Sequence, residues 1–274
     1  MHFFTTLFDG GLGYSGLNTA RAALSSVIDL ADSQHTTGSH PLIIRFLKGV
    51  FHSRPTLPRY AATWDVSSVL LYLKNMPGND VITLKDLSFK TVMLCLLVTG
   101  CRGQTVHLLN LQHMQIREDA YVFHIKELLK QSRPGKSQPA IKFTAYPSDT
   151  SLCVVSCLRE YISRTESLRT AHGQLFISYQ KPHKPVSRTT ISRWVRATLA
   201  AAGIDTCYYK PHSTRSASTS AAVATSTPLD TILKTAGWTS ASTFAKYYHK
   251  RVEQSNSYSD NVLSCIASES TLST

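Results

Sequence analysis

The sequence predicts a mainly helical α+β chain that contains one small β-hairpin. Apolar residues recur at helical spacing through most of the long segments, for example in 19–31 and 83–98. Two short segments, 121–125 and 140–146, instead alternate between apolar and polar side chains, which is typical of strands. The turn signal Pro134-Gly135 lies between them, so the two segments are expected to form a hairpin.

Residues 1–52 are expected to form a small helical domain. A first helix begins at or before Met1, and a second covers 19–31 with Ser15 or Asn18 as its cap. A third starts with Pro41 at its first position and presents Arg45 and Lys48 three residues apart, on one face. Residues 53–63 contain two prolines and two arginines with little periodicity, which indicates a linker.

Residues 64–252 are expected to form the larger domain, followed by a serine-rich tail over 253–274. Pro77-Gly78 ends its first helix, and the apolar run over 83–98 predicts a buried helix. Ser187 is the expected N-cap of a later helix that carries Arg188, Arg193 and Arg196. The remaining expected elements are helix 150–166, strand 174–178, helix 229–235 and helix 242–251.

The charge of the chain indicates a polyanionic partner. The formal net charge is +12 at pH 7, and residues 117–196 hold 14 Lys and Arg against 6 Asp and Glu. A generic solubilising surface is the alternative, although solubility needs no such one-sided excess. Neither a run of about 18–20 apolar residues nor a signal peptide is present, so we expect an intracellular protein with no membrane partner.

Several kinds of chemistry lack support in the sequence. There is no glycine-rich phosphate loop and no pair of carboxylates at catalytic spacing, which argues against nucleotide hydrolysis and glycoside hydrolysis. The six cysteines have no metal-site spacing and are expected to be free thiols. We therefore expect no metal, no cofactor and no small-molecule substrate.

The segment 212–249 gathers groups that suit a phosphodiester. His212 and Arg215 lie three apart in a run that Pro211 can start and Pro228 must end, so both side chains share a helix face. Such a pair, with a bidentate guanidinium, is suited to hold a phosphate. Gly237-Trp238 then breaks the next helix, and a third helix carries Tyr247 and Tyr248.

These residues resemble the active site of the tyrosine recombinase (phage integrase) family. The family pattern is His-x-x-Arg, then Gly followed by His or Trp, then the nucleophilic Tyr ten residues after that Gly. His212 to Arg215, Gly237-Trp238 and Tyr247 match it in order. The family also has an upstream Arg after an apolar run, which Arg102 matches in the segment TGCR.

The resemblance implies a catalytic domain preceded by a core-binding domain, and DNA cleavage through a 3′-phosphotyrosyl bond without metal, ATP or cofactor. It implies double-stranded DNA as partner, self-association as dimer to tetramer, and, for a mobile element of a eukaryote, a nuclear location. Arg102 and Arg215 would clamp the phosphate, His212 would act as base or orienter, and Trp238 would donate its indole N–H. Tyr247 would be the nucleophile, with Tyr248 as rival.

The family's β-hairpin also delivers a catalytic lysine. Lys130, at the end of the first strand, is the expected one, and Lys136 in the turn is the competitor. Lysines of a basic hairpin otherwise neutralise phosphates, so Lys136 is also a candidate DNA contact, as are Arg45, Lys48, Arg188, Arg193 and Arg196.

Three points qualify the match. The residue sequences of the motifs are most similar to those of recombinases of DIRS/Ngaro-type retrotransposons. Thr105 stands where many members carry an acidic residue that supports the first arginine. The helical domain over 1–52 is short for the family's core-binding domain, so part of that domain is expected to be missing from this chain. A catalytically inactive DNA-binding remnant of a mobile element is therefore an alternative function. A protein-interaction domain is a third, and it leaves the basic cluster unexplained.

Overall fold

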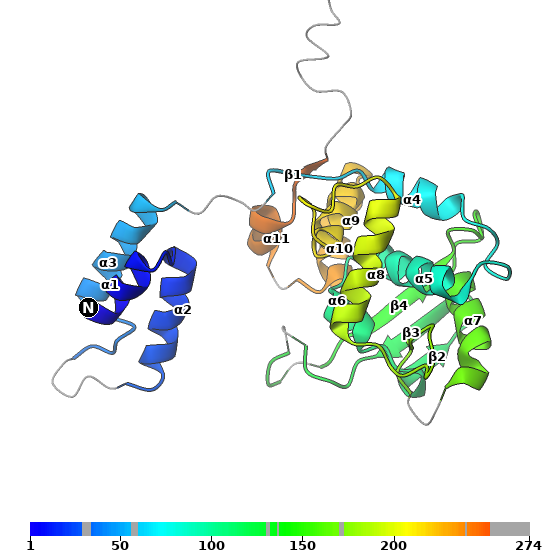
Figure 1. Cartoon of the computed structure of the whole chain (residues 1–274), viewed down its shortest axis with the longest axis horizontal. Coiled ribbons are helices and arrows are strands. Elements are labelled where there is room, and N and C mark those ends of the chain that lie inside the picture. Colours follow the sequence, from blue (N-terminus) through cyan, green and yellow to red (C-terminus); the bar gives the residue numbers. More distant parts are fainter. Residues whose placement is uncertain are drawn as a thin grey trace, which may run out of the picture. The chain divides into compact units, whose positions relative to one another are not determined.

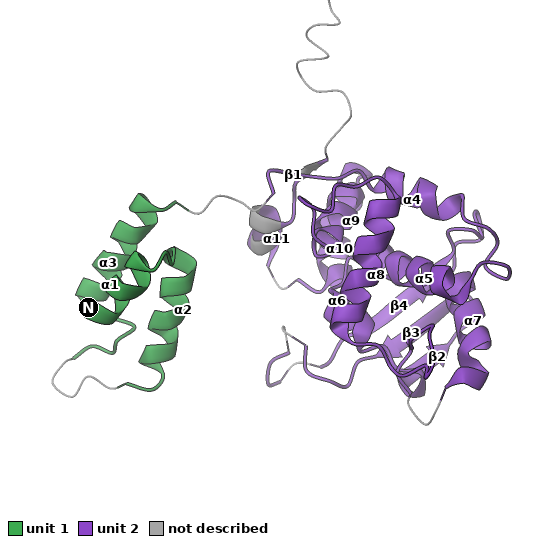
Figure 2. Ribbon diagram, viewed as in Figure 1, with its two compact units in different colours: residues 1–59 green, residues 60–274 purple. Residues whose placement is uncertain are grey.

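The computed structural model describes residues 1–28, 34–55, 60–129, 132–135, 137–169, 173–238 and 240–252, without the side chains at positions 243, 246, 247 and 251. The chain forms two compact units, Met1–Arg59 and Tyr60–Thr274 (Figure 2). The division falls inside the expected linker 53–63. No helix of the described part is both long and apolar enough to cross a membrane.

The first unit is a three-helix cluster made of α1 (His2–Asp9), α2 (Tyr14–Ser25) and α3 (Pro41–Ser53). Its core residues come from all three helices and are Phe4, Leu17, Ile43, Leu47 and Val50. As predicted, α3 has proline at its first position, and the ring of His40 caps it by accepting the N–H of Leu42.

The predicted cap of α2 is wrong. The helix covers Tyr14–Ser25 rather than 19–31, so Ser15 and Asn18 both lie inside it. Gly11 adopts a positive φ of 93°, which lets the chain turn early, and the N–H of Leu17 already bonds to the carbonyl of Gly13.

The second unit is mostly helical with a small antiparallel sheet, as the sequence predicts. The sheet has the order β2-β3-β4, and its strands are β2 (Met114–Ile116), β3 (Ala120–His124) and β4 (Ala140–Thr144). β3 and β4 form the predicted hairpin, with Tyr121 opposite Phe143 and Phe123 opposite Ile141. The sequence missed β2, whose three residues are too few to show alternation.

Helix α5 (Leu84–Thr99) is the buried centre of this unit. Thr83 caps it, and most of its side chains are buried, including that of Lys90, whereas Val98 is 47% exposed. Around it pack α7 (Val154–Thr165), α8 (Arg188–Ala201), α9 (Ser213–Ala224) and strand β4 (Figure 1). A helix with apolar side chains on most of its surface must be covered by other elements. The packing of these neighbours around α5 explains its run of apolar residues.

The other helices of the unit are shorter. They are α4 (Val66–Lys74), α6 (Gly103–His107), α10 (Leu229–Ala236) and α11 (Ala241–Tyr247), with 3-10 turns at Leu111–His113 and Glu166–Leu168. Ser187 caps α8 as predicted, because its hydroxyl accepts the N–H of Thr190.

Two predicted elements need correction. The expected strand 174–178 contains only isolated bridges, Asn110 to Gln174 and Ile177 to Pro185. The expected helix 242–251 ends at Tyr247, because the chain then runs into β5 (Arg251–Val252), which pairs in parallel with β1 (Ala62–Thr63). That pairing joins residues almost 190 positions apart, so no local pattern could show it.

Gly100, at the end of α5, gives a test of this packing. Its φ is +56°, and a Cβ there would lie 2.8 Å from Cγ2 of Thr219 in α9. We expect Gly100→Ala to lower the free energy of unfolding by about 1–2 kcal/mol, since a left-handed conformation costs an L-residue that much. Urea denaturation measures the change.

Gly103→Ala is the matched control, because its Cβ would meet nothing within 4 Å and its φ is not positive. We expect it to leave stability within about 0.5 kcal/mol of wild type. An equal loss in both variants would contradict the close contact between α5 and α9.

Candidate active site

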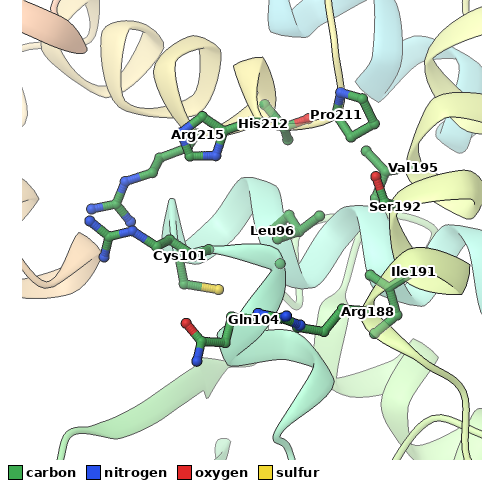
Figure 3. A pocket seen from close by; sticks show the side chains of 13 residues that line it. Leu96, Cys101, Gln104, Arg188, Ile191, Ser192, Val195, Pro211, His212 and Arg215 are labelled. Atoms are coloured by element: carbon green, nitrogen blue, oxygen red, sulfur yellow. The ribbon is translucent and has the colours of Figure 1, made fainter. Parts of the chain in front are cut away.

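The amino-terminal end of α9 lies at a cavity of about 180 Å³. His212 is the residue before the helix and Arg215 lies in its first turn, and both line this cavity. Figure 3 shows these two side chains on one side of the cavity, with Arg188 and Gln104 on the other. The sequence predicts that His212 and Arg215 share a helix face. In the structure both residues lie at the start of α9 and line one cavity.

Arg215 is buried, with only 2% of its surface exposed. Its Nη1 donates to the carbonyl of Gly100 at 2.6 Å, and its Cζ lies 3.9 Å from the ring centroid of Trp238. Its Nε and Nη2 are buried and have no hydrogen-bond partner among the described residues. A buried guanidinium with two unused donors is prepared to receive an anion.

The surroundings of Arg215 lower its pKa to about 10. Burial is the main cause, and the charge of Arg102 adds to it, while the phenol of Tyr248 and the thiol of Cys101 act in the opposite direction. At neutral pH the guanidinium is still protonated, because a pKa of about 10 lies well above 7.

Arg102 lines the same cavity from another part of the chain. It stands at the junction between α5 and α6, as the residue before Gly103, and it is partly buried. Arg188 reaches the cavity from α8. Three arginines and one histidine thus line it, with no carboxylate among its described lining residues. Such a cavity attracts anions.

Thr105, which stands where an acidic residue was expected, is buried in α6. Its backbone N–H donates to the carbonyl of Arg102 at 2.8 Å. The neighbouring Gln104 donates from Nε2 to the carbonyl of Leu128 at 3.4 Å. The short helix α6 therefore holds the Arg102 backbone through its own main chain.

Trp238 closes another side of the site. Gly237 ends α10 with a φ of 71°, and the N–H of Trp238 then bonds back to the carbonyl of Leu233. The indole packs against Phe244 of α11 and Tyr248, with ring centroids 5.0 Å and 4.7 Å away. Its Nε1 is buried without a partner among the described residues.

The tyrosine pair lies at the end of α11. Tyr247 is the last residue of that helix, and its side chain lies outside the described part of the structure. The ring of Tyr248 lies 6.2 Å from the ring of His212, and the Arg215 Cζ lies 5.3 Å from the Tyr248 centroid. The structure thus places one phenol of the pair, Tyr248, beside the histidine and the arginine.

The candidate lysines and DNA contacts are distributed as follows. Lys130 and Lys136 both lie outside the described residues. Arg45 and Lys48 are exposed on α3 of the first unit. The other three candidates are exposed on α8, but Arg188 lines the arginine cavity, whereas Arg193 lines a second cavity with Tyr179 and Trp194, and Arg196 lines neither.

Cys101 also lines the cavity and is a second nucleophilic side chain to consider. Burial raises the pKa of its thiol, and this effect outweighs the nearby arginines, which act in the opposite direction. A thiol whose pKa is raised stays protonated at neutral pH and is a poor nucleophile. The five described cysteines are free thiols, as the sequence predicts for all six, and four of the five are buried.

The sequence did not single out the hydroxyls that hold this site together. Ser216 and Ser220 of α9 both donate to the carbonyl of Tyr248, at 2.8 Å and 3.0 Å. Their spacing from His212, four and eight residues, was the available signal, because such positions share a helix face. The carbonyl of Gly100 gave no signal, since a backbone acceptor has no side chain to recognise.

Comparisons with known proteins agree with this geometry. Residues 74–254 match the model of the Phage integrase family. Among solved structures, the Tn1549 transposon integrase with transposon right end DNA aligns with a TM-score of 0.62 and 12% identity, over 97% of this chain and 83% of that one. The XerH site-specific recombinase in its post-cleavage complex aligns at 0.60 and 14%, over 96% and 69%.

A lambda integrase tetramer bound to a Holliday junction aligns with a TM-score of 0.54 and 14% identity, over 93% of this chain and 64% of that one. At these identities the likeness shows the fold. No curated protein matches the sequence.

The start of α9 depends on a buried hydrogen bond that can be tested. The indole N–H of Trp64 donates to the hydroxyl of Ser213 at 2.9 Å, and both residues are buried. We expect Ser213→Ala to lower the free energy of unfolding by about 1–3 kcal/mol, because the buried indole N–H is left without an acceptor. Thermal or urea denaturation checks this.

Ser192→Ala is the control, since Ser192 lines the same cavity but is exposed. A change within about 0.5 kcal/mol is expected there. If Ser213→Ala were as harmless as Ser192→Ala, the Trp64 bond would not hold the start of α9.

Proposed function

Because this chain belongs to the phage integrase family, we propose that it cleaves and rejoins DNA strands through a covalent 3′-phosphotyrosyl intermediate. The observation that carries this proposal is the buried Arg215, with two unused donors in a cavity that Arg102 and His212 also line. A phenol lies beside them. This set contains a nucleophile and a stabiliser of phosphate charge.

The two arginines supply charge stabilisation. A phosphodiester under attack becomes a pentacoordinate phosphorane with extra negative charge on its non-bridging oxygens. The guanidinium groups of Arg102 and Arg215 bind those oxygens. The Nε and Nη2 of Arg215 are already buried, so they lose no further hydration when the phosphate binds. Trp238, whose indole N–H is also buried and unused, donates to the same phosphate.

The remaining residues of the site carry out the proton transfers. A phenol is protonated at neutral pH, so the proton of the attacking tyrosine must be accepted during attack. His212 takes that role, because its ring centroid lies 6.2 Å from that of Tyr248 in an edge-on arrangement. Lys130 protonates the departing 5′-oxygen. The phosphotyrosyl bond keeps the energy of the broken link, so a 5′-hydroxyl can later reseal the strand without ATP.

The substrate in this proposal is double-stranded DNA. The net charge of +12 supports it, and the exposed Arg45, Lys48, Arg188, Arg193 and Arg196, together with Lys136, serve as backbone contacts. Among the similar solved structures are DNA-bound recombinases, one of them a tetramer on a Holliday junction. We therefore include self-association on DNA.

The biological setting we propose is a mobile element. The likeness to a transposon integrase supports it, as does the similarity of the motifs to DIRS/Ngaro-type retrotransposon recombinases. Action on a eukaryotic genome would require a nuclear location.

A second candidate is an inactive DNA-binding remnant. It is favoured by Thr105, which is a buried hydroxyl where an acidic support was expected. The two candidates differ in one product, since only an active enzyme forms a covalent adduct with DNA.

The experiment is incubation with a pool of labelled duplexes that have a randomised central segment and a single nick. After cleavage beside the nick, the short 5′-hydroxyl fragment diffuses away and the protein stays attached. We expect a denaturation-resistant adduct on a gel. Salt-sensitive DNA binding with no adduct would support the remnant instead.

Arg215→Lys tests the role of the guanidinium fork in the same assay. The variant keeps the charge but loses bidentate binding, so we expect adduct formation to slow by about 10²–10³-fold. Arg159→Lys, an exposed position of α7 outside the cavity, is the matched control and should stay within about twofold of wild type. Equal rates for Arg215→Lys and wild type would contradict the phosphate clamp.

A further inference from the structure

The position of Tyr248 is determined by the helix that carries His212 and Arg215. Its carbonyl oxygen accepts hydrogen bonds from the hydroxyls of Ser216 and Ser220, at 2.8 Å and 3.0 Å. Ser220 accepts in turn from the N–H of Lys250 at 3.0 Å. Both serines are buried, so these bonds are shielded from water. The backbone on either side of the Tyr248 carbonyl is thus held against α9.

The ring of Tyr248 extends from this anchored backbone into the site. Its centroid lies 4.7 Å from that of Trp238 and 6.2 Å from that of His212, and 5.3 Å from the Cζ of Arg215. The phenol also acts electrostatically on Arg215, since it opposes the fall in the arginine's pKa that burial causes. Three groups of the proposed site therefore contact this one residue.

From these contacts we propose that Tyr248, rather than Tyr247, is the nucleophile of the strand cleavage, an inference that rests on the proposed function. Adjacent helical positions project about 100° apart, so only one of the pair can face the phosphate. Tyr248 is still held in helical geometry, because its N–H bonds to the carbonyl of Phe244 at 2.9 Å.

The spacing from Gly237 selects Tyr247, and there is a physical reason why it can fail. Helix α10 ends at Ala236 and α11 begins at Ala241. One residue more between these two helices moves every side chain of α11 by about 100°. Counting from Gly237 therefore selects a residue pair, and the described contacts support Tyr248 as the member of that pair.

The step balances as follows. The Oη of Tyr248 forms a bond to phosphorus while the bond from phosphorus to the 5′-oxygen breaks. The phenolic proton passes to the imidazole of His212, and the departing 5′-oxygen takes a proton from Lys130 and leaves as a hydroxyl. Arg215 stays protonated throughout and binds a non-bridging oxygen. Resealing is the reverse, with a DNA 5′-hydroxyl as the attacking group.

The test compares Tyr247→Phe and Tyr248→Phe on the nicked duplex pool. Each change removes one oxygen and keeps the ring, so the packing against Trp238 is retained. We expect Tyr248→Phe to lose the adduct completely and Tyr247→Phe to form it at a rate within about threefold of wild type, since the loss of one hydroxyl that takes no part in the reaction is a small change. Far-ultraviolet circular dichroism shows that both variants fold.

The tyrosine that is bonded to DNA can also be identified in the wild-type adduct, without either variant. Trypsin cuts after Lys246 and Lys250, which gives the peptide Tyr-Tyr-His-Lys with both candidates in it. After nuclease digestion, fragmentation in a mass spectrometer should place the nucleotide on the second tyrosine. This measurement decides the matter even if both phenylalanine variants are inactive.

The outcomes separate the inference from the proposed function. An adduct on the first tyrosine, lost in Tyr247→Phe and kept in Tyr248→Phe, overturns the assignment of Tyr248 and leaves the recombinase function standing. An adduct that both single variants still form, on neither tyrosine, overturns the phosphotyrosyl mechanism itself. The absence of any wild-type adduct overturns both.

Discussion

A guanidinium ion that leaves water must find acceptors or an anion, and Arg215 has only 2% of its surface exposed. One of its nitrogens bonds to the carbonyl of Gly100, and its Cζ lies over the indole of Trp238, 3.9 Å from the ring centroid. These two contacts compensate for part of the lost hydration, and the two unused donors remain uncompensated. Burial, and after it the charge of Arg102, lowers the pKa of Arg215 to about 10. A bound phosphate would supply acceptors for the two donors and a charge opposite to that of the arginines.

The helix that begins beside His212 owes its position to hydroxyl groups rather than to bulky apolar side chains. Ser213 accepts from Trp64, Ser218 donates to the carbonyl of Leu97, and Ser216 with Ser220 holds the carbonyl of Tyr248. Small side chains let α9 approach α5 closely, and Gly100 allows the closest approach. One helix therefore connects the buried centre of the unit to the tyrosine segment.

Local signals in the sequence were sufficient for much of the fold. The cap at Ser187 and the proline at the start of α3 both depend on neighbouring residues, and both predictions are confirmed. The cap of α2 was predicted wrongly because a glycine turn competes with the serine. The pairing of β1 with β5 depends on contacts across nearly the whole unit, which no window of sequence contains.

The same contrast between local signals and long-range contacts applies to the site. The residues that meet at the cavity were expected from their resemblance to a known family, since spacing alone does not bring Arg102 to Arg215. The identity of the nearby phenol depends on how many residues connect α10 to α11, and therefore on the folded structure. Arg215 is held by the carbonyl of Gly100, and Tyr248 is held through its own carbonyl. Every residue has a backbone carbonyl, so the sequence does not show which ones form these bonds.

The central claim is that Arg215 neutralises a non-bridging oxygen of the scissile phosphate. The most direct measurement is the rate at which Arg215→Ala forms adduct with two nicked duplexes, one with an ordinary phosphate and one with a neutral methylphosphonate at the cleavage position. The account predicts a large loss on the phosphate and a substantial recovery on the methylphosphonate, because the neutral linkage has less charge to stabilise. An equal loss on both duplexes would contradict it.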